Sequence, residues 1–145
     1  MDQLERVQTI AHSEVRKQFP FFAFHARRLS YEVADCKTFA TDGNRVVINP
    51  EFAETLDDDG VLWVLVHEYL HVVGKHHLRQ PEEVNGLKVT HFAWNVACDI
   101  AINQLIEDVP GFHPGALLPG KCGTPEVYHQ SAEYYLPHVL LWLKE

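Results

Sequence analysis

The feature that most constrains the fold of this chain is an apolar segment followed directly by a histidine-rich one. From Asp58 the sequence reads DDGVLWVLVHEYLHVVG, and residues 61–66 are apolar without interruption. Asp58 or Asp59 is suited to cap a helix and to favour its positive N-terminal end. A helix that is apolar on every face belongs in the interior of a domain. Polar side chains on such a helix need partners, because burying them unsatisfied is costly.

Two histidines and a glutamate follow in the pattern H-E-x-x-H. At 3.6 residues per turn, His67 and His71 point about 40° apart, one turn above the other, so both imidazoles can bind one ion. Glu68 stands beside the first of them, where it can take a proton from a metal-activated water. Zinc (Zn²⁺) would satisfy these groups, so we predict that His67 and His71 are metal ligands and that Glu68 is a general base.

A catalytic zinc site needs a third protein ligand, and the sequence offers two candidates. His71, Gly74 and His77 match the metzincin spacing H-x-x-G-x-x-H, in which the chain turns at the glycine and the last histidine reaches the metal. That arrangement requires a helix break at Gly74 and a later methionine turn, yet the only methionine is Met1. His76 and His77 are instead expected to close the C-terminus of the helix, where positive charge is favourable.

The other candidate is Asp99, in the segment WNVACDIAINQLI. A helix here is largely apolar, but Asn95, Asp99 and Asn103 recur at every fourth position and form one narrow polar stripe. Such a stripe usually faces water. Beside a buried metal, a carboxylate from a neighbouring helix is a natural ligand, so we favour Asp99 over His77.

The remaining pattern indicates a mainly helical α+β domain spanning residues 1–145. Helices are predicted over residues 2–18, 21–30 and 90–107, with a final pair of short helices over residues 125–144 capped by Thr124. The runs KTFAT and RVVIN flank a turn triplet containing Gly43 and predict a β-hairpin. The polar segment RQPEEVNGLK, with Pro81 and Gly86, is predicted to be a loop.

Composition narrows the classes of function. The formal net charge of −8 argues against nucleic acid as the main partner. The three cysteines are widely spaced and form no C-x-x-C pair, which favours a reducing cytoplasm. No apolar run approaches the about 20 residues that cross a bilayer, so neither membrane association nor secretion is expected.

Several blocks of the sequence, in this order, resemble one family. They are PFFAF, ATDGNRVVINPEF, VLVHEYLHVVGKHHLR, WNVACDIAINQLI and ALLPGKCGTPEVY. Together they resemble the bacterial putative metallopeptidase domain that is often found upstream of a von Willebrand A-like domain. The resemblance implies a zincin-like fold, with a small β-sheet or hairpin packed on the helix of the H-E-x-x-H motif and a second helix that completes the site.

We therefore expect a zinc-dependent metallopeptidase, a hydrolase that cleaves a peptide or protein substrate with Glu68 as general base. Residues 38–41 or 46–48 could offer a strand edge to an extended peptide. Unranked candidates for the donor that stabilises the oxyanion are His91, Tyr128, Tyr134 and Tyr135. The alternative is a non-catalytic, metal-stabilised interaction module, whose weakness is that a purely structural zinc site has no need of Glu68.

Overall fold

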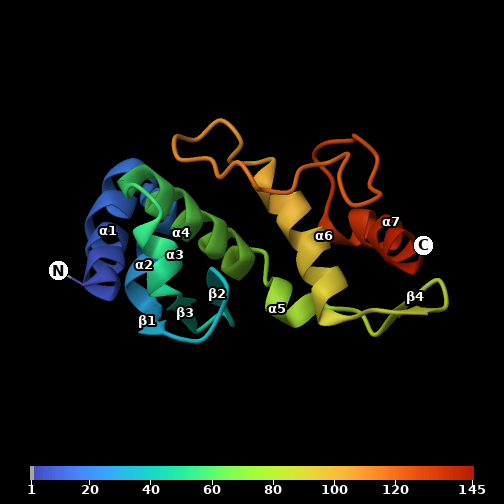
Figure 1. The fold of residues 1–145 in the computed structure, drawn as a ribbon, viewed down its shortest axis with the longest axis horizontal. Coiled ribbons are helices and arrows are strands. Elements are labelled where there is room, and N and C mark those ends of the chain that lie inside the picture. Colours follow the sequence, from blue (N-terminus) through green and yellow to red (C-terminus); the bar gives the residue numbers. More distant parts are fainter. Residues whose placement is uncertain (1) are drawn as a thin grey trace. The chain divides into compact units, whose positions relative to one another are not determined.

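The computed structural model describes residues 2–145 and has a mainly helical α+β architecture with a small sheet (Figure 1). The chain forms two compact units. The first runs to His77 and also contains Val109–His113, and the second consists of Leu78–Asp108 and Pro114–Glu145. The predicted fold class is confirmed, and the single domain over residues 1–145 stays a prediction.

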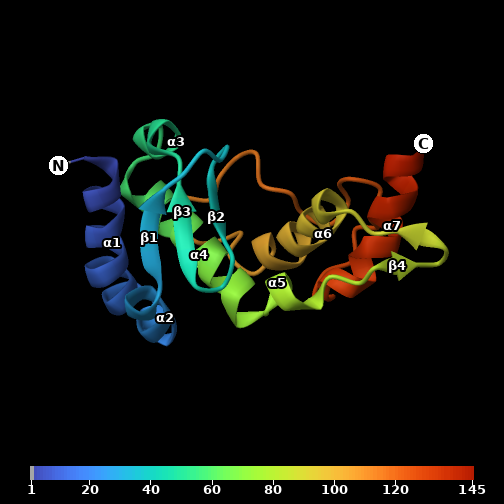
Figure 2. The same ribbon diagram turned by 90° about the horizontal axis from the view of Figure 1, so that it is seen from below.

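The first unit contains a three-stranded sheet. Its strands are β1 (Ser30–Val33), β2 (Phe39–Thr41) and β3 (Arg45–Ile48), with β3 in the middle, parallel to β1 and antiparallel to β2 (Figure 2). The turn between β2 and β3 uses Gly43 at φ 93°, and the Asp42 carboxylate accepts from the backbone N–H groups of Asn44 and Arg45. The predicted hairpin is confirmed, whereas β1 is an addition that the sequence pattern does not indicate.

Helices pack around this sheet in the first unit. The first, α1 (Gln3–Gln18), is capped by the Asp2 carboxylate, and its apolar face is buried. After it come η1 (Pro20–Phe22), α2 (Ala23–Arg28), α3 (Pro50–Glu54) and α4 (Asp58–Val73). α4 contacts both α1 and β2. The helix predicted over residues 2–18 is confirmed. The one predicted over residues 21–30 is present as η1 followed by α2, but it ends early, at Arg28, because Ser30 begins β1.

α4 carries the apolar segment and the H-E-x-x-H pattern. The apolar residues before the motif are all buried, as the pattern predicts. The cap is Asp57, whose carboxylate accepts from the N–H of Gly60 at 2.7 Å, so the predicted cap at Asp58 or Asp59 is wrong. The guanidinium of Arg6 holds Asp58 at 3.0 Å, which leaves Asp57 to take the capping position.

α4 ends close to Gly74. This residue has a helical φ of −72°, but the next residue, Lys75, is left-handed at φ 54°. Lys75 turns the chain into a separate short helix, α5 (His76–Arg79). His76 and His77 therefore do not close α4, contrary to the prediction, because the left-handed residue intervenes.

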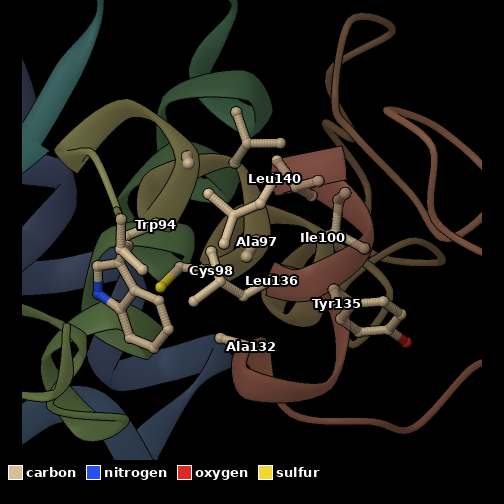
Figure 3. Packing of buried hydrophobic residues seen from close by; sticks show 12 residues of the cluster. Trp94, Ala97, Cys98, Ile100, Ala132, Tyr135, Leu136 and Leu140 are labelled. Carbon is tan, nitrogen blue, oxygen red and sulfur yellow. The ribbon is translucent and has the colours of Figure 1, made fainter. Parts of the chain in front are cut away.

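The second unit is built on two helices. α6 (His91–Asn103) is capped by Thr90, and α7 (Ala132–Lys144) packs against it (Figure 3). The buried cluster between them includes Trp94, Ala97, Cys98 and Ile100 from α6, and Ala132, Tyr135, Leu136 and Leu140 from α7. The helix predicted over residues 90–107 is right at its start and ends early, at Asn103. Among residues 2–145, no helix combines the length and the apolar character that a membrane span requires.

Two predictions for the second unit are wrong. The segment predicted as a loop contains a hairpin of β4 (Glu83–Val84) and β5 (Leu87–Lys88), whose turn residues Asn85 and Gly86 have φ 52° and 79°. The final pair of helices is a single helix, α7, which continues through Pro137. Thr124 caps no helix, because its hydroxyl donates to the carbonyl of Lys121 within a turn.

Candidate metal centre

One face of α4 carries a row of rings. Trp63, His67 and His71 are four residues apart, which places them one above another on a helix. The rings of Trp63 and His67 are stacked, with centroids 5.7 Å apart and an interplanar angle of 29°. The rings of His67 and His71 meet edge to face, with centroids 4.7 Å apart. The indole therefore supports His67 on one side while His71 lies on the other.

The two histidines converge on one point. Nε2 of His67 lies 3.1 Å from Nε2 of His71. Two zinc–nitrogen bonds of about 2.0–2.1 Å that meet at a tetrahedral angle would hold their nitrogens about 3.3 Å apart. Two lone pairs cannot face each other at the observed distance without a proton or a cation between them, so the spacing suits two ligands of one ion.

Glu68 lies beside this pair and is buried, with 4% of its surface exposed. Ligand atoms of His67, Glu68 and His71 all lie within 4.8 Å of one another, and the three residues form a group that could hold a metal ion. A buried carboxylate is costly unless it is paired, hydrogen-bonded or close to a cation. The arrangement places a carboxylate that can act as a base close to both imidazoles.

A thiol shares this electrostatic environment. Cys36 lies half-buried between β1 and β2, and its Sγ donates to the carbonyl of Thr38 at 3.4 Å. Burial raises the pKa of the Cys36 thiol, and the negative charges of Asp35 and Glu68 raise it further. Burial and these two charges both favour the neutral thiol over the thiolate.

The ring of His76 extends the row beyond α4. Its Nδ1 lies 3.1 Å from Nδ1 of His71, with ring centroids 5.2 Å apart, and His76 is 8% exposed. Sequence periodicity gives no sign of this contact, because residues five apart on a continuous helix point about 140° away from each other. Only the left-handed Lys75 brings the two rings together.

His77, the alternative third ligand, lies elsewhere in the first unit. Its side chain is exposed and packs on the turn between β2 and β3, where a Cβ added to Gly43 would lie 2.3 Å from Nε2 of His77. The helix break that the metzincin spacing requires is present, but it directs His77 to the hairpin. His77 is not a member of the group formed by His67, Glu68 and His71.

Asp99, the favoured third ligand, is half-buried on α6 in the second unit. The other members of its polar stripe differ from one another. Asn95 is exposed, whereas Asn103 is buried and its side-chain amide donates to the carbonyl of Leu117 at 3.0 Å. The stripe therefore combines a surface residue with a structural one, and Asp99 as the third ligand stays a prediction from the sequence.

The candidates for an oxyanion donor all belong to the second unit. The Tyr135 hydroxyl is buried there, donates to the carbonyl of Val127 at 2.6 Å and accepts from the side-chain amide of Gln104 at 3.0 Å. Its one hydrogen is therefore already donated within the second unit and is not directed at a substrate. The other three candidates stay unranked.

Sequence comparison identifies one family. Its profile, described as a putative metallopeptidase domain, matches residues 3–134, a region that includes the group on α4 and Asp99. Neither the comparison with curated proteins nor the comparison with solved structures gives a significant match. The chain therefore belongs to the putative metallopeptidase domain family.

Proposed function

We propose that this chain is a zinc-dependent metallopeptidase in which Glu68 acts as the general base. The observation that carries the proposal is the pair of Nε2 atoms of His67 and His71, 3.1 Å apart, with the buried Glu68 on the same helix. Membership of the putative metallopeptidase domain family supports the same function.

Zinc is the metal that the donor set favours. Neutral imidazole suits zinc, and two histidines with one carboxylate and an open position are a common catalytic arrangement. A zinc ion bound there would supply Lewis acidity, which polarises a carbonyl and makes water a better nucleophile at neutral pH. His67 and His71 would hold the ion through Nε2, and on the sequence argument Asp99 would be the third ligand.

The role of Glu68 is to move a proton. Its carboxylate would accept a proton from the attacking water as the new C–O bond forms at the peptide carbonyl carbon. It would then deliver that proton to the amide nitrogen as the C–N bond breaks, which yields a carboxylic acid and an amine. Burial of Glu68 would keep bulk water away from the proton during the transfer.

β2 is the strand edge with which an extended peptide substrate would pair. β3 is hydrogen-bonded to a strand on each side, so the alternative edge at residues 46–48 is wrong. β2 contacts α4, and the carbonyl of Thr38 just before it accepts from the N–H of Asn49. Because antiparallel pairing alternates, the main-chain groups of Phe39 and Thr41 are turned away from β3. A peptide along that edge would gain main-chain hydrogen bonds.

The proposed substrate is an extended peptide or protein segment, and neither nucleic acid nor a membrane is proposed as a partner. The formal net charge of −8 supports this choice, since a nucleic-acid backbone would be repelled. The free thiols of Cys36, Cys98 and Cys122 support a reducing, cytoplasmic location.

The test replaces Glu68 with glutamine. Glu68→Gln fills nearly the same volume, so fold and zinc content should persist, whereas peptide hydrolysis should fall by about 10²–10⁴-fold. The assay is cleavage of a peptide library by zinc-loaded wild type and variant, with zinc content measured on the same samples. His67→Ala is the companion variant, which should lose both zinc and cleavage.

Two results would change this conclusion. Equal cleavage by wild type and Glu68→Gln would refute the general-base mechanism. If the zinc-loaded wild type cleaves nothing while a chelator lowers its unfolding temperature, the function is that of a non-catalytic, metal-stabilised interaction module.

A further inference from the structure

The contact between His71 and His76 limits what each ring nitrogen of His71 can do. Nε2 of His71 faces Nε2 of His67 at 3.1 Å, and Nδ1 of His71 faces Nδ1 of His76 at 3.1 Å. A neutral imidazole has one N–H and one lone pair. If Nε2 gives its lone pair to a metal, Nδ1 must carry the hydrogen, and that hydrogen points at His76.

We propose that His76 is a positioning residue that selects the metal-binding tautomer of His71 and fixes the plane of its ring. Nδ1–H of His71 donates to Nδ1 of His76, which places the hydrogen of His76 on its own Nε2. Ligand histidines commonly donate their second N–H to a carboxylate, a carbonyl or water, and here another imidazole takes that place. The inference rests on the proposed function, because it requires His67 and His71 to be the metal ligands.

The fold leaves little freedom to the His76 ring. The ring is buried, and the left-handed Lys75 directs it back toward α4. Gly74 adds a second constraint, because a Cβ built on it would lie 2.9 Å from Nε2 and 3.1 Å from Cε1 of His76. Since φ of Gly74 is −72°, its backbone conformation does not require glycine. The missing side chain is needed to make room for the His76 ring.

The test measures zinc affinity separately from catalysis. Wild type, His76→Leu and His76→Asn compete for zinc with a chromophoric chelator. His76→Leu removes the acceptor for Nδ1–H of His71, and we expect zinc binding about 10- to 100-fold weaker. His76→Asn places an amide oxygen close to the position of Nδ1 and should recover most of that loss. His138→Leu removes a half-buried histidine of α7 in the second unit and, as the matched control, should bind zinc like wild type.

Gly74→Ala gives an independent variant in which His76 itself is retained. The added methyl group would also lie 3.1 Å from the carbonyl oxygen of Leu70, so thermal unfolding of the zinc-free variant is measured to show that it still folds. The added methyl group should displace the His76 ring and weaken zinc binding toward the value of His76→Leu. A stable variant with weakened zinc binding separates positioning from a general loss of structure.

Proton–nitrogen correlation spectra of the imidazole rings supply a direct readout. In the zinc-loaded wild type, the ring hydrogen of His71 should be on Nδ1 and that of His76 on Nε2. The inference is overturned if His76→Leu binds zinc like wild type, if leucine and asparagine at this position weaken binding equally, or if the hydrogen of His76 is on Nδ1. Wild type and His67→Ala with the same zinc affinity would instead overturn the proposed metal centre, and the inference with it.

Discussion

Replacing Tyr31 and Tyr69 with phenylalanine, singly and together, should show that their two buried hydroxyls contribute unequally to stability. The Tyr31 hydroxyl donates to the carbonyl of Ala26 at 2.6 Å, so its hydrogen is used there. The Tyr69 hydroxyl, 2.8 Å away, must therefore donate to the oxygen of Tyr31. Tyr69 follows Glu68 on α4, so the pair helps to hold α4 and its candidate metal group against β1 and α2.

The two single substitutions should differ in magnitude. Tyr69→Phe removes one hydrogen bond and leaves that of Tyr31 to Ala26 intact, so the free energy of unfolding should fall by about 1 kcal/mol. Tyr31→Phe removes both bonds and leaves the Ala26 carbonyl and the Tyr69 hydroxyl buried without this partner, so the fall should be about 2–4 kcal/mol. In the Tyr31→Phe background, Tyr69→Phe deletes a donor that has lost its acceptor. The free energy of unfolding of the double variant should therefore be about 1–2 kcal/mol higher than that of Tyr31→Phe.

The assay is urea unfolding followed by circular dichroism, with the four free energies combined in a double-mutant cycle. The expected signature is a change of sign: Tyr69→Phe destabilises the wild type and stabilises the Tyr31→Phe variant. The same effect in both backgrounds, or a larger loss for Tyr69→Phe than for Tyr31→Phe, would refute the donor directions assigned to this pair.

Three further predictions concern the third ligand, a close backbone contact and alkaline pH. Asp99→Ala should lose zinc on dialysis, and with it the chelator-sensitive part of its thermal stability, while His77→Ala stays close to wild type; the reverse result would favour the metzincin arrangement. Gly111→Ala should lower the free energy of unfolding in denaturant by about 2–4 kcal/mol, because this position is left-handed. The Cβ of the new alanine would also lie 2.2 Å from the carbonyl oxygen of Asp59. An unfolding midpoint of Gly111→Ala equal to that of wild type would contradict this contact. Burial raises the pKa of Tyr31 to about 12 in the folded protein. An unfolded tyrosine titrates near pH ~10. The contribution of the Tyr31 hydroxyl to the free energy of unfolding should therefore be fully present below that pH and should be lost as the pH rises toward ~12. The measurement is the thermal unfolding temperature between pH ~10 and ~12, and an unfolding temperature that does not change with pH would contradict a buried Tyr31 hydroxyl.

Local periodicity was sufficient to predict the elements that carry the candidate site. The apolar residues of α1 recur at helical spacing, and all of its predicted span except the cap is helical. The hairpin of β2 and β3 follows from two β-prone runs around Gly43, whose positive φ the turn requires. These features depend on residues close together in sequence, which is why the pattern alone reveals them.

Competing local signals were resolved by contacts between distant residues. Three successive aspartates could cap α4, and Arg6 on α1 engages Asp58 while Asp57 takes the cap. Pro137 indicates a break in the last helix, at a cost of about 3 kcal/mol. Burial of Leu136 and Val139 against α6, at about 1.5–3 kcal/mol for each large apolar side chain, offsets that cost.

The sequence by itself determined that His67, Glu68 and His71 lie together, because the hydrogen bonds of a helix fix the positions of residues one and four apart. Only the tertiary structure decided that β1 lies beside β3 and that His76 meets His71. The first requires the chain to return between Ser30 and Arg45, and the second requires the left-handed backbone of Lys75. Such reversals leave no periodic signal, because they are stabilised by contacts that exist only after the chain has folded.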